Sequence, residues 1–176
     1  MKLRDLALPA IALIVLAADQ ASKAWIIENV PLNGSLEIIP QLKDWFVLTH
    51  ITNSGAAFGL FPQASLIFTF VALAVSLVIV FYHRSLPPGQ WLVRLSLGLQ
   101  LGGAVGNLVD RLRYGGVVVD MFYIRPFPVF NIADASIVSG VALLMWHLSR
   151  TAPKEPNTVA TAPVETMEKT DSSGNG

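Results

Sequence analysis

Cysteine is absent from the sequence, which excludes disulfides, thiol nucleophiles and cysteine-ligated metal sites. Histidine is scarce, with three scattered copies, so a histidine-rich metal site is not expected either. Charged residues make up only 14% of the 176 residues, whereas soluble domains carry about 25%. The formal net charge is zero, which gives no reason to expect a nucleic acid as partner. These absences argue against a soluble fold and predict a site without metal or cofactor.

Hydrophobic residues, in contrast, make up 53% of the chain and gather in four long runs. A helix that crosses the hydrocarbon core of a membrane needs about 20 mainly apolar residues. We predict four such helices over residues 6–26, 65–82, 91–109 and 132–148. The first is interpreted as a retained helix, because no small-residue cleavage site follows it as in a removable signal peptide. The third contains several glycines, which predict close helix packing.

The remaining segments complete a predicted fold of one membrane domain over residues 1–150. Residues 28–63 form an extracytoplasmic insertion with turn signals, and the runs 36–39 and 45–51 predict short strands. Residues 151–176 are polar and are predicted to be a disordered tail. A slight excess of Lys and Arg on one side places both termini in the cytoplasm. The expected fold class is therefore membrane all-α, with four transmembrane helices and a small β-sheet.

Polar residues gather at one end of these predicted helices, the end on the extracytoplasmic side. Ionisable groups inside a membrane helix are costly and are functional candidates by default. The helical candidates are Asp19, Lys23, Asn107, Asp110, Arg111, Asn131 and Asp134. Two further candidates lie outside the helices, namely Asp120 in a predicted loop and the turn at 52–55.

Each of these residues also has a simpler structural interpretation. Asp19 and Lys23 are one helical turn apart and can form an ion pair. Asn131 can cap the fourth helix, because asparagine is a favoured N-cap residue. Asp120 alone would ordinarily be a solvated carboxylate. Asp134 is harder to explain in this way, since it begins an apolar helix with no basic residue near it in the sequence.

Asp120 and Asp134 together suggest catalysis. Only residues 121–133 separate them, so the chain can fold back and bring the two carboxyl groups together. Two carboxyl groups in contact do not both ionise readily, and they share a proton. The ionised member can then activate water, while the protonated member donates to a substrate carbonyl or leaving amine. This is the chemistry of an aspartic protease.

Five stretches of the sequence resemble motifs of the bacterial lipoprotein signal peptidases, over residues 5–150. They are residues 19–23, 53–59, 102–111, 118–120 and 130–134. The resemblance implies an aspartyl endopeptidase of the bacterial inner membrane, with several membrane passes. It implies that this enzyme cleaves prolipoproteins before a cysteine that already carries diacylglycerol. Membrane lipid and cyclic peptide inhibitors of the globomycin type are implied as further ligands.

The same resemblance implies a role for each matching residue. Asp120 and Asp134 match the catalytic pair. Residues that match positions lining or supporting the site are Asn53, Gly55, Asn107, Asp110, Arg111 and Asn131, and Asp19 and Lys23 match a pair near it that is more plausibly structural. Family members also place a small extracytoplasmic sheet and a mobile loop beside the site.

The sequence also allows two other classes of function. A small proton-coupled transporter would use Asp19, Asp110 and Asp134 as a proton relay. The gathering of polar groups at one interface, rather than across the midplane, argues against it. A non-catalytic membrane assembly factor would explain the glycines but not the aspartates.

Overall fold

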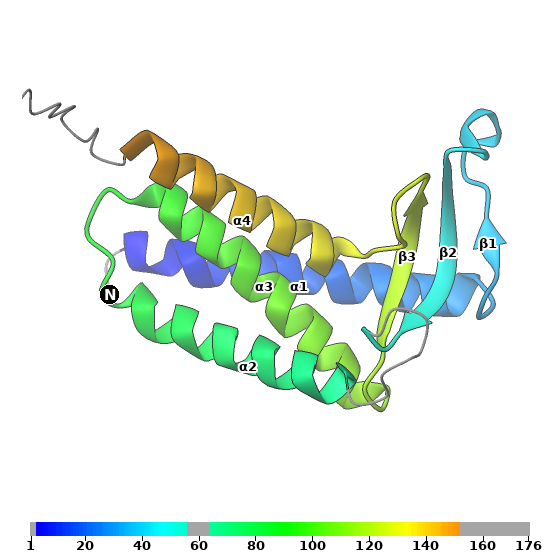
Figure 1. The fold of residues 1–176 in the computed structure, drawn as a ribbon, viewed down its shortest axis with the longest axis horizontal. Coiled ribbons are helices and arrows are strands. Elements are labelled where there is room, and N and C mark those ends of the chain that lie inside the picture. The colour runs from blue at the N-terminus through cyan, green and yellow to red at the C-terminus, as the bar shows by residue number, and fades with distance from the viewer. Residues whose placement is uncertain (1–2, 56–63, 152–176) are drawn as a thin grey trace, which may run out of the picture.

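The computed structural model describes residues 3–55 and 64–151 and consists of four long helices with a three-stranded sheet at one end (Figure 1). The helices are α1 (Leu3–Asn29), α2 (Ala64–His83), α3 (Trp91–Arg113) and α4 (Ile132–Thr151). All four are long and apolar enough to cross a membrane. The four predicted helices are confirmed, and each extends slightly beyond the predicted range. Apart from Thr151, which ends α4, the predicted tail lies outside the described residues.

Helix α3 is the central helix of the bundle. Of its membrane span, 61% is buried inside the protein, against 28%, 11% and 17% for the spans of α1, α2 and α4. The other three helices pack around α3, with α2 and α4 on opposite sides of it (Figure 1). Many large apolar side chains of the outer helices stay exposed, including Phe70 at 67% and Phe81 at 68%. An exposed apolar surface of this extent is what a lipid-facing bundle presents.

Small residues on α3 allow this packing, as the sequence predicted. A Cβ added at Gly102 would lie 2.7 Å from the carbonyl oxygen of Ala12 on α1. A Cβ added at Gly103 would collide with the carbonyl oxygen of Ala133 on α4. The backbones of α1 and α4 therefore approach α3 on adjacent faces, at distances that only glycine permits.

The sheet has the order β1-β2-β3, with all neighbours antiparallel. Its strands are β1 (Ser35–Leu36), β2 (Phe46–Asn53) and β3 (Val118–Ile124), and a short 3-10 helix, η1 (Pro40–Leu42), separates β1 from β2. The strand predicted over 45–51 is confirmed as β2. The strand predicted over 36–39 is wrong for most of its length, because β1 ends at Leu36 and residues 37–39 turn towards η1.

The prediction that Asp120 lies in a loop is wrong, because Asp120 is part of strand β3. The β-branched and aromatic residues around Asp120 favour extended backbone, and β2 supplies the partner that the local sequence does not reveal. Buried apolar side chains between the sheet and the end of α1 hold β3 in place: Ile26, Val30, Leu48, Val119 and Met121.

Strand β2 contains a β-bulge. Leu48 pairs with Phe122 and Ile51 with Asp120, so two residues of β2 stand opposite the single Met121 of β3. A bulge bends its strand and changes the direction in which the following side chains point. Here it sets the register that brings Asn53, at the end of β2, beside Asp120.

Candidate functional site

A buried cation lies where α1 and α3 meet the sheet. The Lys23 ammonium lies 2.8 Å from an Asp19 oxygen and 2.9 Å from an Asp110 oxygen, and it donates to the Asn107 side chain over 3.2 Å. All four side chains are buried. The predicted Asp19–Lys23 pair is confirmed, and Asp110 extends it to a triad. Ion pairs and hydrogen bonds of this kind offset much of the desolvation free energy of the buried charges.

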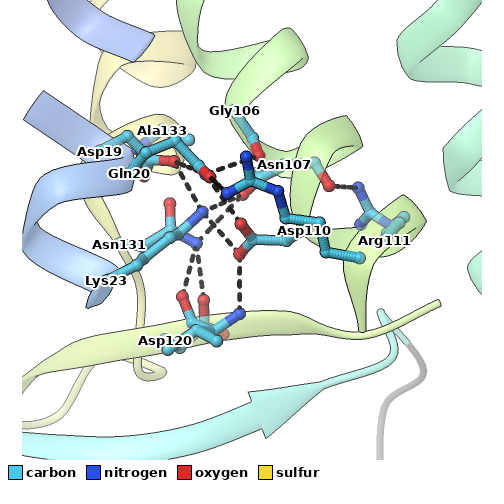
Figure 2. Close-up of polar contacts among 12 residues, drawn as sticks. Asp19, Gln20, Lys23, Gly106, Asn107, Asp110, Arg111, Asp120, Asn131 and Ala133 are labelled. Atoms are coloured by element: carbon cyan, nitrogen blue, oxygen red, sulfur yellow. Dashed lines mark hydrogen bonds and ion pairs between the residues drawn. The ribbon is translucent and has the colours of Figure 1, made fainter. Parts of the chain in front are cut away.

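The two aspartates of the triad also accept hydrogen bonds from distant backbone. The second oxygen of Asp19 accepts from the N–H of Ala133, in the first turn of α4, over 3.0 Å. Asp110 accepts from the N–H of Val119 on β3 over 3.0 Å. The triad therefore joins α1 and α3 to the two chain segments that carry Asp120 and Asp134. Figure 2 shows these contacts converging between the helices and β3.

Asp120 points from β3 towards this cluster and is only 2% exposed. Its carboxylate accepts from the side-chain amide of Asn131 over 2.7 Å and from that of Asn53 over 3.0 Å. The pKa of Asp120 is raised to about 6, chiefly by burial and also by the negative charge of Asp134, against the lowering effect of the two amides and Lys23. A carboxyl group with this pKa exchanges its proton near neutral pH, as acid–base catalysis requires.

Asp134 lies in the first turn of α4 and is half-buried. One of its oxygens accepts from the Asn107 side-chain amide over 2.8 Å, and the other accepts from the backbone N–H of Asn131 over 3.3 Å. In return, the Asn131 side-chain oxygen accepts from the N–H of Asp134 over 2.9 Å. This reciprocal pair is a capping box, so the predicted N-cap role of Asn131 is confirmed.

Asn131 therefore contacts both carboxyl groups at once. Its side-chain amide donates to Asp120 and its backbone N–H donates to Asp134. The same side-chain amide also donates to the Asn107 oxygen over 3.2 Å, and that oxygen is held by Lys23. The two aspartates that the sequence singled out are thus brought to one site, joined by one asparagine.

The profile of the family described as signal peptidase (SPase) II matches residues 11–150. The chain belongs to this family of membrane peptidases.

Individual relatives agree with this assignment. The lipoprotein signal peptidase of Moorella thermoacetica is 49% identical over 78% of this chain and 89% of its own length. That of Halothermothrix orenii is 42% identical over 78% of this chain and 92% of its own length. A solved bacterial membrane enzyme, 28% identical, superposes with a TM-score of 0.71 over 82% of this chain and 94% of its own.

A cavity of about 310 Å³ leads from the site of this signal peptidase II family member along the helices. Residues of α2, α3 and α4 line it. Asp134, Asn107 and Arg111 line its polar end, and apolar side chains such as Val75 and Ile137 line the remainder. Because the membrane surrounds these helices, the cavity gives an apolar molecule a place beside Asp134.

Arg111 stands at the edge of the site. Its guanidinium donates to the backbone oxygen of Asn107 over 3.3 Å and lies 5.7 Å from the centre of the Phe68 ring of α2. Its Nε is buried and has no hydrogen-bond partner within residues 3–55 and 64–151. Arg111 thus brings a positive charge and five N–H donors to the polar end of the cavity.

Gly55 has a conformational role. It adopts a φ of +78°, and its N–H donates to the Asn53 side-chain oxygen over 2.8 Å, which orients the amide that reaches Asp120. The rest of the motif at 53–59 continues into residues outside the described part of the chain.

Sequence reasoning gave no role to two residues of the network. Gln20 donates to Asp110 over 2.8 Å, and the Arg113 guanidinium donates to the Gln20 side-chain oxygen over 3.0 Å. Gln20 stands beside Asp19 in a matching motif, which was the available signal. Nothing in the sequence connected Arg113 with Gln20. Among the residues described, no group of three His, Asp or Glu side chains is arranged to hold a metal ion.

Proposed function

We propose that this peptidase removes signal peptides from prolipoproteins whose cysteine carries diacylglycerol, cutting just before that cysteine. Asp120 and Asp134 act as an aspartic dyad. One observation supports this most directly, namely that the single residue Asn131 donates hydrogen bonds to both carboxyl groups. The two aspartates are thus held as one unit, and the pKa of Asp120, raised to about 6, lets this carboxyl group take up and release a proton near neutral pH.

In the proposed reaction the ionised carboxylate takes a proton from a water molecule. The water oxygen then attacks the carbonyl carbon before the lipidated cysteine, while the protonated carboxyl group donates its proton to the carbonyl oxygen. When the tetrahedral intermediate collapses, the C–N bond breaks: the carboxyl group that took the water proton gives it to the leaving amine, and the other carboxylate takes back the proton of the intermediate's hydroxyl as the carbonyl re-forms. The cycle returns the dyad to its starting protonation. Asn53, Asn131 and Asn107 hold the carboxyl groups in place throughout.

The position of the site suits a lipidated substrate. Asp134 stands where the polar cluster meets the apolar cavity, so acyl chains in the bilayer and a peptide bond at the polar cluster can be held together. A substrate unwound at this level would expose backbone groups that are costly to leave unpaired in lipid. We propose that this end of the bundle faces the extracytoplasmic side of a bacterial inner membrane and that both termini are cytoplasmic.

The deciding experiment is cleavage of a synthetic precursor in detergent, with and without the diacylglyceryl group. Asp120→Asn and Asp134→Asn are each expected to lower kcat by at least about a thousandfold while the protein remains folded. Asp44→Asn, which alters an exposed carboxyl group in a turn, is the matched control and is expected to keep full activity. Cleavage is expected to be insensitive to chelators, because the dyad needs no metal. Full activity in either dyad variant would refute the proposed mechanism.

A further inference from the structure

Gln100 is a half-buried polar residue whose side-chain nitrogen is unusual. It lies on α3 and lines the same cavity as Asp134, among the apolar side chains of its deeper part. The Nε2 atom of Gln100 is buried and has no hydrogen-bond partner in the part of the chain that the structure describes. An amide donor left unpaired in an apolar setting is costly, so such a group calls for an explanation.

The space for this side chain is provided by α4. A Cβ added at Gly140 would lie 2.8 Å from the Gln100 Cγ, so glycine at that position leaves the room that the glutamine occupies. Gln100 therefore sits in a fitted space between α3 and α4. A leucine or methionine would fill that space without an unpaired amide. The presence of glutamine points to a ligand that supplies the missing acceptor.

The depth of Gln100 indicates which part of a substrate would meet it. Gln100 precedes Asn107 by two turns of α3, which is about 10 Å along the helix axis. Asn107 donates to Asp134, so it marks the level of the dyad. An extended peptide covers about 10 Å in three residues. A substrate cut at the dyad and extended before the cut would pass Gln100 about three residues earlier.

At the depth of Gln100, the signal segment of a substrate can present unpaired backbone carbonyl groups. The last four carbonyl groups of a helix have no partner within the helix. If the segment is extended near the dyad and helical deeper in the membrane, its helix ends near Gln100, and those carbonyls need donors. Water does not reach them in the hydrocarbon core, so a protein amide is the available donor.

We propose that Gln100 is a substrate-binding residue that donates a hydrogen bond to a backbone carbonyl at the C-terminal end of the signal helix. This inference rests on the proposed peptidase function and names the part of the substrate that the deep cavity holds. Gln100 acts on substrate affinity and on the position of the cut, not on the chemical step, because it lies two turns from the dyad.

Kinetics test the proposal with Gln100→Leu. The KM for the lipidated precursor is expected to rise about three- to tenfold, the effect of one neutral hydrogen bond, with kcat changed less than about twofold. The substrate-free variant is expected to be at least as heat-stable as the wild type, because an unpaired amide has been removed. Ser76→Ala is the control, since Ser76 is a buried α2 residue whose hydroxyl already donates to the Ala72 carbonyl. An unchanged KM would overturn the proposal, whatever the stability of the variant.

Crosslinking tests it independently of catalysis. The chain has no cysteine, so Gln100→Cys introduces a unique thiol. In an Asp134→Asn background, precursors with one cysteine at successive positions before the lipidated residue are offered for disulfide formation. Crosslinking is expected to peak about three or four residues before the cut and to be absent with Ser76→Cys. Equal crosslinking at every position would overturn the proposal. Cleavage by the wild-type chain is measured alongside: if it cuts the precursor, the proposed function stands whatever Gln100 does, and if it does not, both fall.

Discussion

Replacing Asp120 by asparagine should change how the stability of the protein depends on pH. Burial raises the pKa of this 2% exposed carboxyl group from 3.8 to about 6 in the folded protein. The folded state therefore binds the Asp120 proton more tightly than the unfolded state does. Between these two pKa values the free energy of unfolding falls as pH rises, because the folded protein must either keep the proton or bury a charge.

The size of the effect follows from the pKa difference. A gap of about two pKa units corresponds to about 3 kcal/mol, which is present below pH 4 and lost once the pH passes about 6. Asparagine carries no titrating proton, so Asp120→Asn should lack this loss. The variant also alters the hydrogen bonds from Asn53 and Asn131, but that cost does not vary with pH and cancels when each protein is compared with itself.

The measurement is reversible unfolding in mixed micelles, followed by far-UV circular dichroism, at about pH 4 and about pH 7.5. The wild type should lose about 3 kcal/mol more between the two pH values than Asp120→Asn does. Asp44→Asn, at an exposed position, serves as control and should behave as the wild type. Identical pH dependence in wild type and Asp120→Asn would refute the account of a carboxyl group whose proton is held by burial.

Three further changes test the packing around the dyad. Lys23→Met should lower the free energy of unfolding by about 3–5 kcal/mol, because it leaves two buried carboxylates unpaired, whereas the exposed Lys43→Met should have no effect. Gly103→Ala should cost about 1–3 kcal/mol and reduce cleavage, because the added methyl displaces the first turn of α4; Ser139→Ala, on the exposed face of α4, should do neither. Asn131→Ala should cost about 1 kcal/mol through the lost cap and lower kcat more strongly, since both carboxyl groups lose a contact.

Much of the fold could be predicted from the sequence, because lipid imposes simple rules on a chain. Apolar runs of sufficient length gave the four helices, and the glycines of α3 gave the close packing. The pairing of Asp19 with Lys23 followed from their spacing on one helix. These features depend on local composition and helical periodicity, which a sequence displays directly.

The features that were missed depend on contacts between distant segments. Strand β3 forms because β2 lies beside it, and no local signal outweighed the charged residues, glycines and prolines near it. The placing of Asp110 against Lys23, and of Arg113 against Gln20, requires α1 and α3 to meet at one particular register. The sequence places these residues at one end of the bundle. Tertiary packing decides which amide donates a hydrogen bond to which carboxylate.

Helix α2 stands apart from the rest of this arrangement. Within the described residues, the hydrogen bonds that hold the two aspartates come from α3, β2 and Asn131, which directly precedes α4; the α1 lysine holds Asn107 from behind, and α2 supplies none of these bonds. It contributes an apolar wall to the cavity and a ring beside Arg111. Substitutions that keep α2 apolar can therefore reshape the space offered to a bound lipid or peptide without disturbing the acid–base groups. Among the three helices that line the cavity, α2 is therefore the one whose substitution should change the cavity's shape with the least effect on the acid–base groups.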